Sequence, residues 1–224
     1  MIPKIVHQTF KNNTLPILYK KCQSDIKLIY DDFDYKFYND DDMNIFMEHF
    51  DPIFKHGVFD KLPVKIMQID VFRYCLIYKF GGLYSDMDYQ VTKKFDFSNI
   101  QVALPISVSA KTNNDFVIGN CFFASISSHP FWKKLIDEII ENIDRIIADY
   151  KLNKKSLKKF VLNTTGPGFI TSIYKKYFIN DPSISLLDKH MFHPPRPTNE
   201  KEIKELYKTE NTFGFHHCYG SWLK

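Results

Sequence analysis

The stretch from Ile66 to Asp88 changes its hydrophobic period in the middle, and this change constrains the fold more than any other feature of the chain. Apolar residues first recur at helical spacing, at Ile66, Ile69, Phe72, Leu76, Ile77 and Phe80. Gly81 and Gly82 follow, where a helix commonly ends in a left-handed backbone conformation. From Leu83 onwards apolar and polar side chains alternate, which predicts a short strand carrying Asp86 and Asp88 near its end.

The two acids are two positions apart, so a continuous strand would place Asp86 and Asp88 on one face, roughly 7 Å from each other. We expect this strand to continue over residues 89–91. Carboxylates so arranged can border one cation site, and Mg²⁺ and Mn²⁺ favour such oxygen ligands. Asp-x-Asp alone is a weak signal, because such pairs also occur on solvated strands. The position at a strand end, where open α/β sheets bind ligands, strengthens the interpretation.

Strands and helices alternate along the rest of the chain. Short apolar or alternating runs predict strands over 4–10, 33–38, 100–104, 120–125 and 184–187. Helical periodicity predicts helices over 15–30, 43–50, 131–150, 169–178 and 200–208. This alternation argues for an α/β fold with a mostly parallel central sheet flanked by helices. At 224 residues, the chain suits a single domain.

Composition limits the function classes. The 44% hydrophobic and 16% aromatic content supports a folded core. The 30 basic and 26 acidic residues give a net charge of +4, without the clustered excess of a nucleic-acid binder. This mild positive charge favours anionic ligands such as nucleotide diphosphates. Neither a signal peptide nor a transmembrane segment is evident, so we expect a soluble, cytoplasmic protein that can still associate with a membrane surface.

Two groups of residues could in principle bind a metal, but each has a simpler explanation. Cys22, Cys75, Cys121 and Cys218 are far apart and form no C-x-x-C pair, so we expect free thiols. The polar run 39–42 carries three acids directly before a predicted helix, where capping and dipole compensation explain them better than a metal.

Asp70 and Arg73 are three positions apart on the predicted helix. An exposed pair of this kind stabilises a helix by only about 0.2–0.5 kcal/mol. Their neighbours are apolar, however, and a solvated ion pair would be misplaced there. We therefore expect a buried pair directed at a ligand.

Five motifs occur in the same order as in the glycosyltransferases of family 32. They are Ile-Pro-Lys-Ile-Val-His-Gln-Thr-Phe at 2–10, Asp-x-x-Arg-Tyr at 70–74, Gly-Gly-Leu-Tyr-x-Asp-x-Asp at 81–88, Thr-Gly-Pro at 165–167 and His-His-x-x-Gly-Ser-Trp at 216–222. The chain resembles this family over nearly its whole length, although Phe10 stands where the family usually has Trp. The group has a "DXD sugar-binding" domain and includes yeast-type α-mannosyltransferases and α-galactosyl- and α-N-acetylglucosaminyltransferases. The resemblance implies a GT-A fold, UDP- or GDP-sugar donors, Mn²⁺ (or Mg²⁺) as cofactor, and retention of anomeric configuration.

The resemblance also implies roles for the residues around the acid pair. Asp88 resembles the direct metal ligand, and Asp86 its partner, contacting the donor's ribose or sugar and a metal-bound water. Asp70 and Arg73 resemble the pair that holds the donor sugar's hydroxyls. Asn120 falls where the family has a polar residue near the sugar.

Further residues resemble the family's nucleotide pocket and its closing segment. Those assigned to the donor site are His7, Gln8, Thr9, Tyr38 and Tyr84. One of two adjacent histidines resembles the third metal ligand, with His216 slightly preferred to His217. Ser221 and Trp222 look like the segment that closes over the diphosphate. Because the chain ends soon after Trp222, we expect a minimal catalytic domain without a membrane stem.

We divide the expected domain into a nucleotide-sugar and metal half (1–105), an acceptor half (106–211) and a C-terminal closing segment (212–224). Acceptor contacts are expected from 105–119 and 190–200, with a glycan, glycolipid or protein hydroxyl as acceptor. The favoured function is a metal-dependent retaining hexosyltransferase. Two alternatives are an inactive sugar- or nucleotide-binding module, which would not need the metal pair, and a metal-dependent phosphoesterase, which usually requires further His/Asp clusters.

Overall fold

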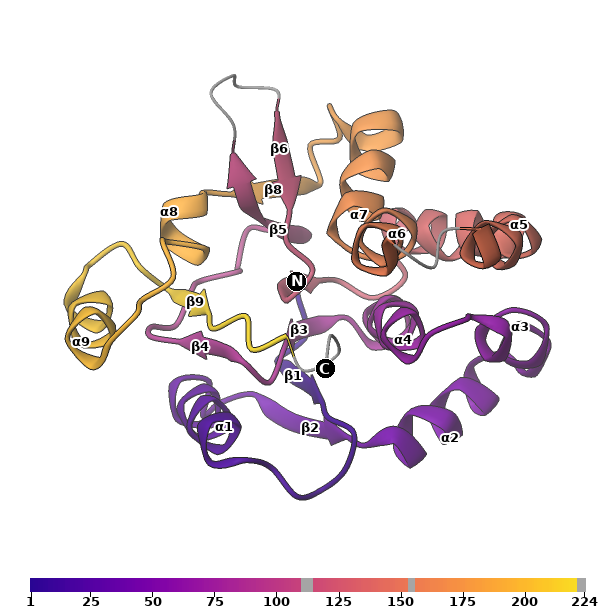
Figure 1. Ribbon diagram of the computed structural model, residues 1–224. Coiled ribbons are helices and arrows are strands. Elements are labelled where there is room, and N and C mark those ends of the chain that lie inside the picture. Colours follow the sequence, from indigo (N-terminus) through magenta and orange to yellow (C-terminus); the bar gives the residue numbers. More distant parts are fainter. Residues whose placement is uncertain (110–114, 153–155, 221–224) are drawn as a thin grey trace.

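A seven-stranded sheet forms the centre of the computed structural model, which describes residues 1–109, 115–152 and 156–220. The spatial order is β2-β1-β3-β7-β5-β6, and β8 lies beside β5 (Figure 1). The strands are β1 (Ile5–Thr9), β2 (Asp34–Tyr38), β3 (Gly82–Ser85), β5 (Val102–Ser109), β6 (Phe116–Ile118), β7 (Phe122–Ser125) and β8 (Ile184–Leu187). A second sheet pairs β4 (Tyr89–Val91) antiparallel with β9 (Gly214–His216).

Strand directions confirm the predicted fold class. β1 runs parallel to β2 and to β3, and β8 runs parallel to β5. β7 is antiparallel to both β3 and β5, so β3 and β5 share one direction. The sheet is therefore mostly parallel, as the alternation of strands and helices predicted.

Helices cover both faces of the sheet (Figure 1). On one side lie α2 (Asp40–Phe50), α3 (Pro52–Gly57), α4 (Lys65–Phe80), α5 (Pro130–Leu152), α6 (Leu157–Thr164) and α7 (Pro167–Ile173). On the other lie α1 (Ile17–Ile29), α8 (Lys189–Phe192) and α9 (Glu200–Lys208). Short helical turns follow α3 (Phe59–Lys61) and α7 (Tyr174–Phe178). All six predicted helices, including the one before Gly81, are present, with shifted ends in most of them.

Alternate side chains of the central strands enter two separate cores. Val102 and Leu104 of β5 belong to the core beneath α2–α7, whereas Ala103 belongs to the core beneath α1 and α8. Tyr84 and Leu83 of β3 divide in the same way. This division follows from the two-residue period of a strand that is covered on both faces.

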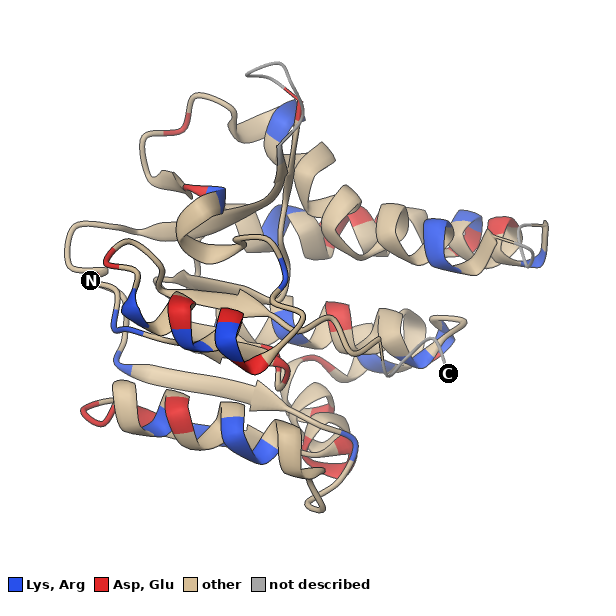
Figure 2. Cartoon of the chain, turned by 60° about the vertical axis from the view of Figure 1, so that its left-hand side comes forward, with Lys and Arg blue, Asp and Glu red and all other residues tan. Residues whose placement is uncertain are grey.

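Two local expectations, the cap of α2 and the free cysteines, are confirmed. The Asn39 side chain accepts hydrogen bonds from the amides of Asp41 and Asp42, so the acidic run begins α2 as a cap. All four cysteines are free thiols. Within the described ranges, no helix is both long enough and apolar enough to cross a membrane. Basic and acidic residues are interspersed along the helices, with no segregation by sign in the view of Figure 2.

Two glycines connect α4 to β3 in backbone conformations that other residues rarely adopt. Gly81 has φ +66° and Gly82 has φ +95°. A Cβ atom on Gly82 would lie 2.6 Å from the Ile5 carbonyl oxygen of the neighbouring strand. The Gly-Gly pair thus lets the turn from α4 into β3 lie directly against the backbone of β1.

We expect Gly82→Ala to lower the free energy of unfolding by about 1–3 kcal/mol, because it combines a positive φ with a backbone clash. Gly57→Ala is the matched control, because nothing lies within 4 Å of a Cβ at that position. It should be neutral, or stabilise by up to about 1 kcal/mol. Urea unfolding followed by circular dichroism measures both. Equal stabilities of the two variants would contradict the assigned role of Gly82.

Candidate active site

The predicted continuous strand over 83–91 is wrong. β3 ends at Ser85, and Asp86–Asp88 form a turn in which the Tyr89 amide donates to the Asp86 carbonyl at 3.0 Å. The chain then enters β4, which pairs with β9 and not with the central sheet. Asp86 and Asp88 therefore do not share the face of one strand. The turn arises because the chain must leave one sheet and enter another at this point.

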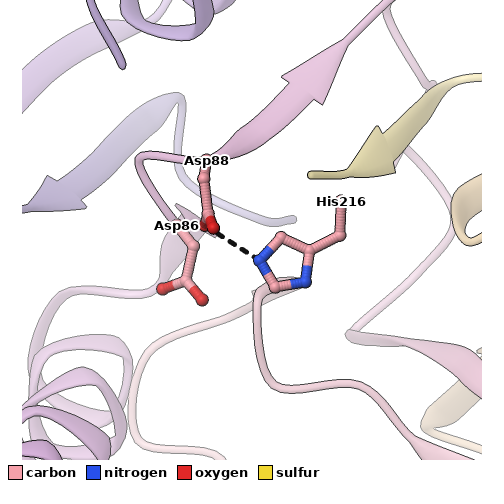
Figure 3. Close-up of side chains that lie close together, drawn as sticks. All are labelled: Asp86, Asp88 and His216. Carbon is pink, nitrogen blue, oxygen red and sulfur yellow. Dashed lines mark hydrogen bonds and ion pairs between the residues drawn. The ribbon is translucent and has the colours of Figure 1, made fainter. Parts of the chain in front are cut away.

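The turn nevertheless brings the two acids together with a histidine from the other end of the chain. One ligand atom each from Asp86, Asp88 and His216 lie within 4.8 Å of one another (Figure 3). His216 is the last residue of β9, and the β4–β9 ladder places it directly opposite Tyr89. Two carboxylates and an imidazole form a donor set that suits a divalent cation such as Mn²⁺.

Asp88 is held by the C-terminal segment on both of its carboxylate oxygens. His216 Nε2 lies 2.8 Å from Oδ1, and the Tyr219 amide donates to Oδ2 at 2.9 Å. Burial alone would raise the pKa of Asp88, but these contacts lower it, so this carboxylate stays ionised. Burial works against a charged imidazole, yet neighbouring Cys121 and Asp88 raise the pKa of His216 well above its usual range.

Arg73 of α4 links the metal cluster to the rest of the site. Its guanidinium is 3.2 Å from the Asp86 carboxylate and 3.5 Å from that of Asp70. It also donates to the Asn120 carbonyl at 2.6 Å and lies over the Tyr84 ring, 4.9 Å from its centre. The side chains of Arg73 and Asp70 are 4% and 3% exposed, which confirms the prediction of a buried pair.

Asp70 occupies the deepest part of this network. Its two oxygens accept hydrogen bonds from the Asn120 amide at 3.0 Å and the Thr165 hydroxyl at 2.9 Å. The Thr165 carbonyl in turn accepts from the hydroxyl of Tyr74. Burial raises the pKa of Asp70 to about 6, although Arg73 and the two hydrogen bonds oppose that shift. The structure therefore brings Asp70, Arg73 and Asn120 together as predicted.

Asp86 is the member of the metal cluster that contacts Arg73. The Tyr84 hydroxyl donates to its Oδ1 at 2.9 Å, and burial raises the pKa of Asp86 against the opposing charge of Arg73. Its amide donates to the Cys121 carbonyl at 2.7 Å, which fixes the start of the turn. Tyr84, which we predicted in the donor site, thus holds the Asp86 carboxylate through a hydrogen bond.

His7 of β1 is fully buried behind the site. Its Nε2 lies 3.0 Å from the Gly81 carbonyl and its Nδ1 lies 3.2 Å from the Tyr38 hydroxyl. Burial lowers the pKa of His7 to about 4, so the neutral ring donates through Nε2 and accepts through Nδ1. These contacts place His7 and Tyr38 beneath the Gly-Gly turn, and their role in donor binding stays a prediction.

Gln8 and Thr9 lie next along the same strand. The Gln8 amide donates to the Asp86 carbonyl at 3.3 Å and accepts from the Tyr35 hydroxyl at 3.0 Å. Thr9 donates to the carbonyl of Tyr38 at 3.0 Å. Gln8 therefore braces the acidic turn from the β1 side, and direct contact with a nucleotide stays a prediction.

The structure separates the two adjacent histidines of the tail. His216 reaches the acids, whereas the His217 ring stacks on Tyr219 with 5.0 Å between ring centres. Tyr219 also contacts Tyr19 of α1. Ser221 and Trp222 lie outside the described residues.

Sequence reasoning missed three contributors to the site. Thr165 belongs to the Thr-Gly-Pro motif, which carried no role until the structure placed its hydroxyl on Asp70. Tyr219 acts through its backbone amide, which leaves no signal in residue type. Cys121 follows Asn120 directly, and its thiol interacts with His216. The sequence could have indicated Cys121, because it directly follows Asn120, which was predicted in the site.

Comparison with known proteins agrees with this geometry. Residues 8–105 match the family described as "Glycosyltransferase sugar-binding region containing DXD motif". An inositol phosphoceramide mannosyltransferase of Schizosaccharomyces pombe is 27% identical over 79% of this chain and 46% of its own length. A mannosyl phosphorylinositol ceramide synthase of Saccharomyces cerevisiae is 26% identical over 79% of this chain and 43% of its own. The chain thus spans less than half the length of these yeast relatives.

Two other known proteins match this chain over a larger share of their own length. An uncharacterized glycosyltransferase of Acanthamoeba polyphaga mimivirus is 24% identical over 99% of this chain and 84% of its own length. The solved structure of the PaToxG glycosyltransferase superimposes with a TM-score of 0.56, covering 80% of this chain and 70% of that one at 15% identity.

The mostly parallel sheet, with its acidic turn at the end of β3, places the protein in the GT-A fold class. The matched region and the relatives make the similarity more specific. Residues 8–105 match the family of the DXD-containing sugar-binding region, and the yeast relatives that align with 79% of this chain are named as a mannosyltransferase and a mannosyl phosphorylinositol ceramide synthase.

Proposed function

We propose that this protein is a metal-dependent, retaining glycosyltransferase that moves a hexose from a UDP- or GDP-sugar to a hydroxyl acceptor. The observation that carries the proposal is the convergence of Asp86, Asp88 and His216, which are joined through Arg73 to the buried Asp70 and Asn120. A binding module would have no need for this continuous network of charges.

Asp86, Asp88 and His216 would hold the cation, and their carboxylate and imidazole donors favour Mn²⁺. A bound divalent cation supplies Lewis-acid stabilisation of the negative charge on the leaving diphosphate. Arg73 orients the Asp86 carboxylate and opposes the burial that raises its pKa, and the Tyr219 amide orients Asp88. The chain's own contribution is thus a rigid, charged cradle whose side chains need little reorganisation.

The engagement of the carboxylates supports front-face transfer. A double displacement requires a carboxylate free to attack the anomeric carbon. Both oxygens of Asp70 accept hydrogen bonds, and both oxygens of Asp88 are engaged by the tail. Both oxygens of Asp86 lie near Arg73. We therefore infer that the acceptor hydroxyl attacks from the side of the leaving group, and its proton passes to the departing diphosphate as the C1–O bond breaks.

The yeast relatives direct the choice of substrates. Their names describe transfer of mannose to inositol phosphoceramide, a lipid that carries a hydroxylated ring. GDP-mannose is therefore the first donor to test, and a polyol or sugar ring attached to a lipid is the first acceptor class. UDP-sugars remain in the panel because the site network does not distinguish the base.

A donor panel tests the proposal directly. Thermal unfolding should be measured with GDP-mannose, UDP-glucose, UDP-galactose and UDP-N-acetylglucosamine, each with Mn²⁺ and with EDTA. A ligand present at 100 times its dissociation constant stabilises the native state by about 2.7 kcal/mol, so the true donor should raise the unfolding temperature. We expect this rise with Mn²⁺ only, accompanied by slow release of nucleoside diphosphate.

The released product separates the alternatives. Nucleoside diphosphate together with free sugar indicates a glycosyltransferase that uses water in place of its acceptor. Binding without any release would favour an inactive module, whereas inorganic phosphate as the first product would favour a phosphoesterase. If no donor binds and none is hydrolysed, the proposed function is wrong.

A further inference from the structure

The two segments expected to supply acceptor contacts meet at Gly119 and His193. A Cβ atom on Gly119 would lie 2.7 Å from His193 Nε2, so the imidazole lies against the glycine backbone. No positive φ explains glycine here. The close approach of the ring is therefore the reason for a residue without a side chain at position 119.

Contacts with α8 and with Tyr89 fix the position of His193. Its amide donates to the Lys189 carbonyl at 2.6 Å, and the carbonyl of Phe192, the residue before it, accepts from the Tyr89 hydroxyl at 2.8 Å. The Tyr89 ring packs edge-on to His193, with ring centres 5.9 Å apart. The same tyrosine begins β4, directly after Asp88. The position of the imidazole is thus tied to the metal-binding turn.

One side chain separates His193 from the metal cluster. The Cys121 thiol is 3.8 Å from His193 Nε2 and also interacts with His216. Asn120, between Gly119 and Cys121, reaches Asp70. His193 therefore borders the same short segment that contributes Asn120 to the sugar clamp.

The His193 ring has hydrogen-bonding capacity to spare. Within the described ranges, the long contact with the thiol of Cys121 is its only polar side-chain contact. The ring is only partly exposed, and burial lowers the pKa of His193 to about 3, assisted by His216 and Lys189. A neutral imidazole can both donate and accept a hydrogen bond, which matches an uncharged hydroxyl group.

We propose that His193 is an acceptor-binding residue, whose imidazole hydrogen-bonds a hydroxyl of a polyol or sugar acceptor beside the attacking oxygen. This inference rests on the proposed transferase function. His193 follows α8, which succeeds β8 on the flank of the sheet remote from β1 and β2 (Figure 1). Of the residues predicted for the nucleotide pocket, His7, Gln8 and Thr9 lie on β1, Tyr38 on β2 and Tyr84 on the adjacent β3. An acceptor would thus enter from the His193 side and meet the donor sugar at Asn120.

The first test compares transfer with hydrolysis of the same donor. His193→Phe keeps a ring of similar shape but cannot form a hydrogen bond. With myo-inositol or methyl α-mannoside as the acceptor probe, we expect the ratio of transfer to hydrolysis to fall about tenfold, the effect of losing one hydrogen bond. His190→Phe changes an exposed histidine of α8, three residues before His193; it is the matched control and should keep the wild-type ratio. Gly119→Ala should lower the ratio in the same way by displacing the ring.

An equal fall of transfer and hydrolysis in His193→Phe would place the ring on the donor or metal side and overturn the inference. A second measurement does not depend on turnover. Histidine ring ¹H–¹⁵N signals of the full chain are recorded with Mg²⁺ during titration with either probe, and His193 is assigned by its absence in His193→Phe. We expect its signals to shift. His193 signals that do not shift with either probe would also overturn the inference. A wild-type protein that hydrolyses no donor would instead contradict the proposed function.

Discussion

Asp88→Asn is expected to lower kcat/KM for donor turnover about 10³-fold, because a metal supplies several kcal/mol of charge stabilisation and each 1.36 kcal/mol is a factor of ten. Asparagine retains the shape of the side chain: its carbonyl oxygen can still accept from the Tyr219 amide, and its NH2 group can donate to Nε2 of a neutral His216. The fold should therefore survive, with a thermal unfolding temperature close to that of the wild type. The loss should appear in the affinity for Mn²⁺, measured by calorimetry, as well as in turnover.

The matched control for this variant is Asp144→Asn. Asp144 is exposed on α5 and takes no part in the site. It removes the same charge from the protein and should leave both turnover and Mn²⁺ affinity unchanged. If Asp88→Asn binds Mn²⁺ and turns over donor as the wild type does, the cluster of Asp86, Asp88 and His216 is not the metal site.

Arg73→Met is expected to cost about 3–5 kcal/mol of stability, the usual effect of removing one partner from a buried ion pair. Methionine fills a similar volume without charge, so Asp70 and Asp86 would be left buried without their shared cation. Adding Asp70→Asn to this variant should recover part of the loss, since one of the two uncompensated carboxylates is then neutral.

Chemical unfolding in urea measures all of these Arg73 variants. Arg145→Met changes an exposed arginine of α5 and should stay within about 0.5 kcal/mol of the wild type. Unchanged stability in Arg73→Met would mean that the guanidinium does not compensate the two acids. A double variant less stable than Arg73→Met would argue against repulsion between them.

The elements with strong local periodicity could be predicted from the sequence. The helical spacing before Gly81 located α4 and hence the Asp70–Arg73 pair, and its apolar neighbours indicated burial. β8 and α9 were predicted with their observed boundaries. These features depend on side-chain patterns within one element, which are visible in a single sequence.

The missed features depend on contacts between elements. Alternation over 83–91 could not reveal that β3 and β4 belong to different sheets, because both strands share a two-residue period. The partnership of His216 with Asp88 spans 128 residues, and only the resemblance to a known family suggested it. The contacts of Thr165 and Tyr219 arise from tertiary packing, which local sequence patterns do not reveal.

The small β4–β9 ladder determines how the third metal ligand is delivered. Two strands of three residues are a marginal unit by themselves. Neighbouring bonds reinforce the ladder, including those from the Thr92 amide to the Phe213 carbonyl and from the His217 amide to the Asp88 carbonyl. Whenever this ladder opens, His216 leaves the acids, and the apparent affinity for the cation falls with the fraction of closed molecules. Metal affinity and the protection of the ladder amides from hydrogen exchange are thus two measures of one local folding equilibrium.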